Sequence, residues 1–184
     1  MKFIFSLSLA FAPVCAAALT PKEVVPRCVA ATDDGIKAEI ALPPGQILDP
    51  REKPETIAVQ CQFAMLSVCA TQAAPSVCLA KVSEDFLAQS LATRSALINL
   101  AEPDRFRRKR LDTWLAATPK SIIADAQANC GRDEMTMLAQ QFASAYQDLS
   151  IPEICALSYM PMDFSLSLGW RRIGYQQSLL PEAN

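Results

Sequence analysis

Cysteine is the residue type that most constrains how this chain can fold. It occurs seven times in 184 residues, and Cys15 lies in an N-terminal segment with the pattern of a removable leader. The other six form an even set, which in an exported protein most simply means three disulfides. These six are Cys28, Cys61, Cys69, Cys78, Cys130 and Cys155. The sequence therefore predicts a cross-linked fold that forms outside the reducing cytosol.

The first 18 residues have the pattern of a secretory signal peptide, in which a lysine is followed by a short apolar stretch and then by three alanines. We expect cleavage after Ala18, with Ala17 as the alternative, and lipid attachment at Cys15 is a competing interpretation. The predicted organisation is a signal peptide over residues 1–18 and one disulfide-stabilised domain over residues 19–184. Since no later segment has the roughly 20 apolar residues of a membrane helix, we expect a periplasmic or secreted protein without membrane insertion after cleavage.

Six cysteines allow many pairings, and we predict the one that joins nearest neighbours along the chain. Cys28–Cys61 would cross a small sheet, Cys69–Cys78 would close the turn into a helix, and Cys130–Cys155 would clamp a later helix. Each bridge would stabilise the fold by about 2–4 kcal/mol, mainly by restricting the unfolded chain. The chain has no Cys-X-X-Cys motif and no histidine, which argues against a redox or zinc role for these cysteines.

The N-terminal part of the predicted domain has alternating apolar residues, which indicate strands. Residues 32–35 have the composition of a turn, and residues 36–42 alternate as a half-buried strand that would pair with a strand carrying Cys28. Residues 43–54 are rich in proline and charge and predict a surface loop. A third strand is expected over residues 55–63. Its inward face would carry Ile57, Val59, Cys61 and Phe63.

After Pro75 the apolar spacing changes toward the 3.6-residue period of helices. Helices are expected over residues 75–100, 103–117, 121–129 and 135–149. A short segment with Pro152 and Cys155 follows, and then Phe164, Leu166 and Leu168 alternate as in a strand, whereas residues 169–184 have no clear pattern. The predicted class is α+β, with a small N-terminal antiparallel sheet packed with a helical majority and stapled by disulfides.

The absence of histidine excludes Ser-His-Asp and Cys-His catalysis and the common zinc hydrolases. Carboxylate-based glycan cleavage is the remaining enzyme class, and it needs two acids that face each other about 5–9.5 Å apart. Candidate acids are Glu84, Asp85, Glu102, Asp104 and Asp163. Glu84 and Asp85 diverge by about 100° around a helix and so do not face each other. We expect no catalytic residue, metal site or cofactor, and we interpret Asp33-Asp34-Gly35 as a hairpin turn rather than a calcium loop.

The most concentrated charged segment is the basic run at residues 105–110. On a helix, Arg107 and Arg110 would project on the same side as Phe106 and Trp114. In one interpretation these arginines pack along apolar surface with their guanidinium groups at its rim. In the other, the four residues form an anion-binding patch, here called the basic surface. The same aromatic and arginine composition recurs near the end of the chain in Trp170, Arg171, Arg172 and Tyr175.

The formal charge is −2 for the whole chain, and loss of Lys2 with the leader makes it one unit more negative. This mild acidity argues against general nucleic-acid binding. We expect an exported binding protein without catalytic activity that recognises a protein or an anionic envelope component. The alternatives are a carboxylate-based hydrolase of cell-wall glycan and a structural subunit of an envelope assembly.

Overall fold

A computed structural model describes residues 19–97, 109, 112–113, 116–130, 133–159, 162 and 168–176. Within these residues every assigned element is a helix and there is no strand. The helices are α1 (Pro21–Ala41), α2 (Pro54–Ala70), α3 (Pro75–Leu97), α5 (Pro119–Asn129), α6 (Asp133–Phe142), α7 (Ile151–Ser158) and α9 (Leu168–Gln176). The predicted α+β class, with its N-terminal sheet, is therefore wrong.

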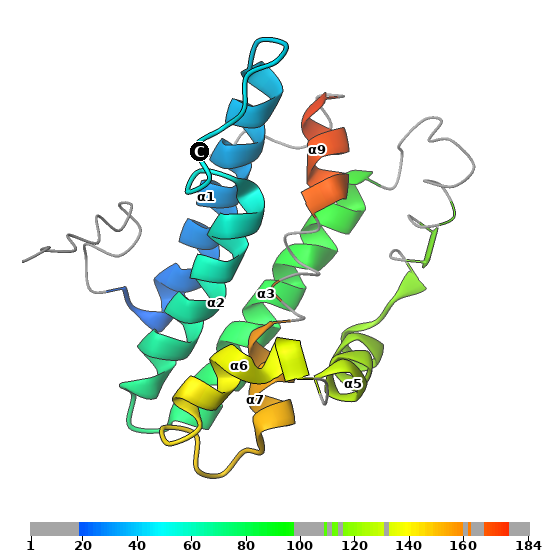
Figure 1. Ribbon diagram of the computed structural model, residues 1–184. Coiled ribbons are helices and arrows are strands. Elements are labelled where there is room, and N and C mark those ends of the chain that lie inside the picture. The colour runs from blue at the N-terminus through cyan, green and yellow to red at the C-terminus, as the bar shows by residue number, and fades with distance from the viewer. Residues whose placement is uncertain are drawn as a thin grey trace, which may run out of the picture.

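The helices form an elongated bundle with a smaller cluster at one end (Figure 1). Helices α1, α2 and α3 pack along one another, and α9 lies against α1 and α3. Helix α7 packs against both α5 and α6, and α6 and α7 lie at the end of the bundle where α2 passes into α3. One continuous apolar core runs through both parts, from Val24 in α1 to Ile154 in α7.

Helix α1 replaces the predicted hairpin because its buried residues recur at helical spacing. Val25, Val29 and Ile36 are among the residues that face the core, and these intervals place them on one side of a helix. The alternation that predicted a strand is not a burial pattern, because Ile36 is fully buried whereas Ile40 is 41% exposed.

Gly35 belongs to the interior of α1, although its sequence neighbourhood predicted a turn. A β-carbon at this position would lie 2.9 Å from the backbone carbonyl oxygen of Glu52 and 3.0 Å from Cδ1 of Ile57. The glycine therefore allows the start of α2 to approach α1 closely, and this approach explains a residue that otherwise weakens helices.

Helix α2 replaces the predicted third strand. Ile57 and Cys61 are buried, four residues apart, whereas Val59 and Phe63 are 56% and 46% exposed. A strand would have placed all four on one face, but a helix separates them into two pairs. The predicted loop between the two elements is present, since α1 ends at Ala41 and α2 begins at Pro54.

Beyond Pro75 the helix predictions agree better with the structure. α3 begins at Pro75, α5 covers the predicted segment 121–129, and α7 contains Cys155. α6 ends at Phe142, before the predicted limit of residue 149, but Tyr146 is fully buried as expected of a core position.

The other predictions for this part of the chain are either wrong or lie outside the described residues. Leu168, placed in a strand by the sequence pattern, is the first residue of α9. Its supposed strand partners Phe164 and Leu166 lie outside the described residues, as does most of the predicted helix at 103–117.

Three disulfides join the pairs given by the nearest-neighbour prediction. Cys28–Cys61 links α1 to α2, and Cys69–Cys78 links α2 to α3. Cys130–Cys155 links the end of α5 to α7. The Cα–Cα separations are 5.7, 5.3 and 5.8 Å, respectively, within the range that a disulfide requires. The first bridge joins two helices rather than crossing a sheet.

Among the described residues, no helix has both the length and the apolar composition needed to cross a membrane.

Candidate functional site

The short helix α9 is held against the bundle by a buried ion pair. Arg171 Nε and Nη2 donate to the two carboxylate oxygens of Asp33 in α1, at 2.6 and 2.5 Å. A third donor, Arg171 Nη1, lies 3.0 Å from the hydroxyl oxygen of Thr93 in α3. Both charged side chains are almost completely buried. This two-point geometry is the strongest arrangement that arginine makes with a carboxylate, and it fixes the position of α9 on both helices.

Tyr175, one helical turn after Arg171, lies beside the same ion pair. Burial, and to a smaller degree the Asp33 carboxylate, raises the pKa of its hydroxyl above the ordinary value. Among the described residues this buried hydroxyl has no hydrogen-bond partner. The ammonium group of Lys37 lies 5.1 Å from the centre of the Tyr175 ring, within the distance of a cation–π contact.

Arg172 extends in another direction from α9 and bridges two acids. Its guanidinium group contacts the carboxylates of Glu39 in α1, at 2.7 Å, and Glu55 in α2, at 2.8 Å. Burial is the largest single effect on the pKa of Glu55 and acts to raise it. The hydrogen bond from Arg172, a backbone hydrogen bond and the charges of Arg172 and Lys53 together outweigh burial, so the net pKa is lowered. Burial likewise acts against the charged form of Arg172, but the two carboxylates raise its net pKa. Both shifts favour the charged forms of Glu55 and Arg172.

A surface hollow of about 390 Å³ lies between this bridge and the connection from α1 to α2. We call it the end hollow. Its apolar wall comes mainly from the connection, and its charged wall from α1, α9 and the start of α2. The lining residues are Glu39, Leu42, Gln46, Ile47, Leu48, Lys53, Pro54, Glu55 and Arg172.

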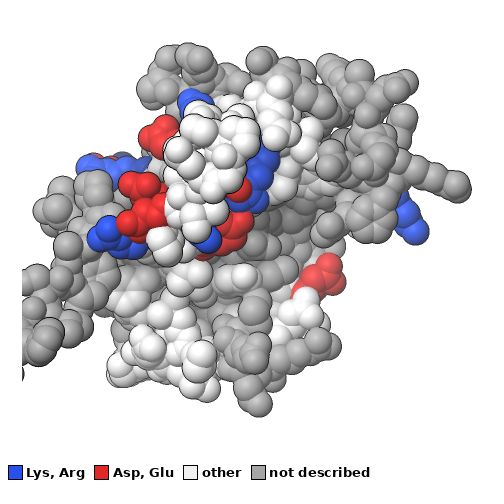
Figure 2. Space-filling model, turned by 45° about the horizontal axis from the view of Figure 1, so that its top comes forward, with Lys and Arg blue, Asp and Glu red and all other residues white. Residues whose placement is uncertain are grey.

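The end hollow combines an exposed apolar wall with charges that already have partners. Ile47 is 83% exposed, the highest exposure among the large apolar residues of the described chain. Figure 2, which brings this end of the molecule forward, shows an uncharged surface flanked by acidic and basic side chains. Such a surface can bind an apolar side chain within a polar rim.

The end hollow does not have the properties of a glycan-cleaving site. That chemistry needs one acid held protonated by an apolar environment, whereas the pKa of Glu55 is lowered by Arg172. Glu39 is bound to the same guanidinium group. Both carboxylates are therefore ion-pair partners of one arginine.

The acids considered from the sequence do not form a facing pair among the described residues. Glu84 and Asp85 both pair with Lys81 on the surface of α3, at 3.7 and 2.9 Å. Glu102, Asp104 and Asp163 lie outside the described residues. The described part of the chain also has no group of three or more residues that could hold a metal ion.

Asp33, which was assigned to a hairpin turn, is instead the buried partner of Arg171 within α1. The predicted basic surface of Phe106, Arg107, Arg110 and Trp114 lies outside the described residues. The residues that the structure does bring together, Arg171 and Arg172, belong to the second aromatic and arginine cluster. Its composition was visible in the sequence, but the acidic partners of the two arginines were not.

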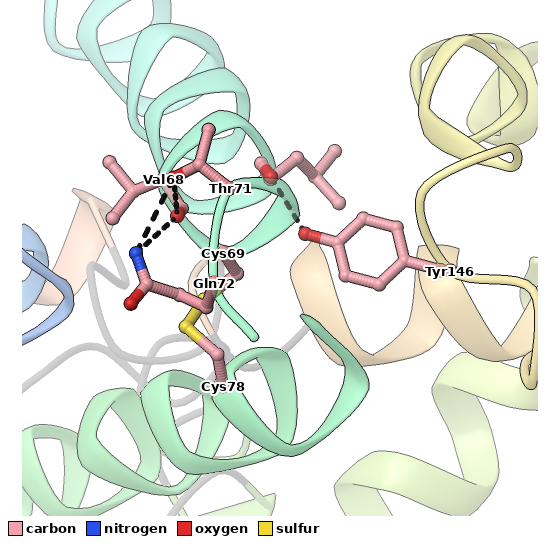
Figure 3. The surroundings of a disulfide bond; sticks show 7 residues. Val68, Cys69, Thr71, Gln72, Cys78 and Tyr146 are labelled. Atoms are coloured by element: carbon pink, nitrogen blue, oxygen red, sulfur yellow. Dashed lines mark hydrogen bonds between the residues drawn. A yellow bond between two sulfur atoms is a disulfide. The ribbon is translucent and has the colours of Figure 1, made fainter. Parts of the chain in front are cut away.

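The disulfides are structural links within the core. Cys28, Cys61, Cys69, Cys130 and Cys155 are at most 1% exposed, and Cys78 is partly buried. Figure 3 shows Cys69–Cys78 beside the turn from α2 to α3, where the side chains of Thr71 and Gln72 donate to the carbonyl oxygen of Val68. Nearby, the Tyr146 hydroxyl donates to the carbonyl oxygen of Leu66 at 2.7 Å.

No protein-family model matches this chain, and comparisons with curated proteins and with solved structures give no significant match.

Proposed function

We propose that this protein is exported and that it acts by binding a protein or an anionic envelope component, without catalysis. Three disulfides, with five of their six cysteines buried, support maturation in an oxidising compartment. The signal-peptide pattern of residues 1–18 agrees with that compartment. The absence of histidine removes the commonest proton-transfer catalyst.

The end hollow is the observation that carries the proposal. It exposes the apolar side chain of Ile47 beside charged groups that are occupied with one another. Burying Ile47 against a partner would gain hydrophobic free energy at about 25 cal/mol per Å² of apolar surface. The bridge of Glu39, Arg172 and Glu55 would form a polar rim that orients the partner. An apolar segment of another protein fits this surface better than a small charged metabolite does.

Site-specific photo-cross-linking in intact cells tests this binding role. A photoreactive amino acid replaces Ile47 in one variant and Val77 in a control variant. The control is matched because Val77 is 70% exposed and apolar, and it lies near the start of α3, at the opposite end of the bundle. We expect one discrete adduct from position 47, lost on Leu48→Asp, and none from position 77. Adducts at neither position, or equally at both, would contradict a specific role of the end hollow.

The basic surface remains the second candidate, for an anionic ligand. Arg107 and Arg110 flanked by Phe106 and Trp114 have the composition of a phosphate- or carboxylate-binding patch. Replacing both arginines by glutamate should weaken capture by anionic envelope material without unfolding the domain. Unchanged capture would eliminate this surface.

The two alternative functions predict different results. A carboxylate-based hydrolase should degrade peptidoglycan and lose this activity on a single Glu→Gln or Asp→Asn change, whereas we expect the purified protein to be inert. A structural subunit should remain in a stable complex through purification. We expect the protein to leave its partner readily instead, because a 390 Å³ hollow offers only a small contact area.

A further inference from the structure

Helix α9 is attached to the bundle more by polar groups than by apolar ones. Of its nine residues only Arg171 and Gly174 are buried. Its larger apolar residues are partly exposed, namely Leu168, Trp170 and Ile173. A helix as short as this is not stable in water without tertiary contacts. The helical form of α9 therefore depends largely on its polar contacts with the longer helices.

The ion pair of Arg171 with Asp33 is the most deeply buried of these contacts, and Arg171 also donates to Thr93. When α9 leaves the bundle, both charges return to water together, and hydration offsets part of the lost contact. The Tyr175 hydroxyl, buried without a hydrogen-bond partner among the described residues, also gains water. Helix α9 can therefore separate as a unit and leave most of the apolar core of α1, α2 and α3 covered.

The next residue along the chain connects this ion pair to the end hollow. Arg172 is the one residue of α9 that lines the hollow, where it contacts Glu39 and Glu55. With α9 in place the charged lining groups balance, since Arg172 and Lys53 offset the two acids. Without Arg172 the hollow is acidic. Burying an apolar segment beside unpaired carboxylates removes their water and costs free energy.

We propose that the ion pair of Asp33 with Arg171 positions Arg172, so that docking of α9 assembles the end hollow. The docked helix offers a partner balanced charges, whereas undocking leaves an acidic hollow that binds the same partner less well. A partner that prefers the docked state shifts the equilibrium toward it, so docking and binding strengthen each other. The docking is independent of any partner, whereas this coupling rests on the proposed function.

Hydrogen exchange on the mature protein tests whether α9 docks through the ion pair. The variant Asp33→Asn keeps the shape of the side chain and removes its charge. The matched control is Asp34→Asn, the same change at an exposed neighbour in α1. In Asp33→Asn the backbone amides of α9 should exchange at least about a hundredfold faster, because Arg171 loses its buried counter-charge. The amides of α2 and α3 should keep their rates, and the control should change none.

A carboxyl NMR titration of Glu55 tests whether Arg172 moves with α9. Burial acts to raise the pKa of Glu55, and the hydrogen bond and charge of Arg172 act to lower it. Release of Arg172 in Asp33→Asn should therefore raise this pKa. Loss of the Asp33 charge alone would lower it, since a nearby negative charge disfavours ionisation. The sign of the change thus separates a displaced Arg172 from a simple charge effect, which Asp34→Asn measures.

Two results would overturn the docking. The first is exchange in α9 that stays the same in Asp33→Asn, or that accelerates equally in α2 and α3, because α9 would then not be a separate unit held by this ion pair. The second is a Glu55 pKa that does not rise, because Arg172 would then keep its place without the ion pair.

Cross-linking at position 47 tests the coupling. At equal protein level, adduct yield should fall in Asp33→Asn and stay at the parent value in Asp34→Asn. A yield that stays at the parent value in Asp33→Asn, with exchange and titration changed as expected, would overturn the coupling alone. If the parent gave no adduct, the proposed function and the coupling would fail together, while exchange and titration would still decide the docking.

Discussion

The close approach of α1 and α2 at Gly35 makes a substitution there the most direct test of the packing. In an isolated helix, Gly→Ala is stabilising by about 0.8–1.0 kcal/mol, because alanine loses less backbone freedom. At Gly35 the new methyl group would meet the carbonyl oxygen of Glu52 at 2.9 Å and Cδ1 of Ile57 at 3.0 Å. The carbonyl oxygen of Glu52 is a backbone atom, so it cannot move aside by a change of side-chain rotamer.

The structure gives a magnitude for Gly35→Ala. Overpacking of a core costs about 1–3 kcal/mol, and a backbone obstacle places this site toward the upper limit. After subtraction of the helix-propensity gain of about 1 kcal/mol, the variant should be destabilised by about 2 kcal/mol. Gly169 provides the matched control, because it is also helical and a β-carbon there would meet nothing within 4 Å. Gly169→Ala should leave the stability unchanged or raise it by up to about 1 kcal/mol.

Urea unfolding of the oxidised mature protein, followed by circular dichroism, measures both changes. The midpoint should fall for Gly35→Ala while the denaturant slope stays the same, since the unfolded surface is unaltered. If Gly35→Ala were as stable as the parent, α1 and α2 could not pack as closely as described, and the explanation of this glycine would be incorrect.

Three further perturbations test the polar contacts. Arg171→Met and Asp33→Leu should each cost about 3–5 kcal/mol, because either one leaves a buried charge unpaired, while the double variant should lose much less than their sum in a double-mutant unfolding cycle. Additive losses would refute this coupling. Tyr146→Phe removes a buried hydrogen bond to α2 and should lower the unfolding free energy by about 1 kcal/mol, measured in the same urea assay. The pKa of Asp49 is lowered to about 2, mainly by the side-chain hydrogen bond from Arg51. The stabilisation from this contact is therefore fully present above pH 3.8, the value without the contact, and is lost as the pH falls through about 2. Arg51→Ala should return this pKa toward 3.8 in a carboxyl NMR titration, and no change would show that the contact is absent in solution.

The N-terminal half shows why local patterns were insufficient to predict the fold. Asp33 and Gly35 are typical turn residues. Yet Asp33 is paired with Arg171, 138 residues away in sequence, and Gly35 packs against the start of α2. Neither partner is visible in a window of neighbouring residues. In α2, apolar residues occupy both the buried and the exposed sides. Val59 and Phe63 therefore extended the alternating pattern that predicted a strand, although neither residue is buried. Long-range contacts therefore overrode local propensity in both helices.

The later part of the chain was more predictable because its signals are local. Pro75 stands at the start of α3 and Pro119 at the start of α5, where a missing backbone N–H costs nothing. The cysteine pairing also followed from short sequence separations of 33, 9 and 25 residues. The candidate site was less accessible to sequence reasoning. The bridge from Arg172 to Glu39 and Glu55 joins three helices, and no spacing rule connects such distant positions.

The three disulfides close three successive loops of the chain, and no bridge links one loop to another. Two bridges connect positions between Cys28 and Cys78, and the third connects Cys130 with Cys155. A single proteolytic cut inside any of these loops would leave one cross-linked molecule on a non-reducing gel. A cut between Cys78 and Cys130 would instead leave two fragments that only side-chain packing holds together. Expressed separately, the two fragments could serve as a complementation pair whose reassembly reports directly on the strength of their mutual interface.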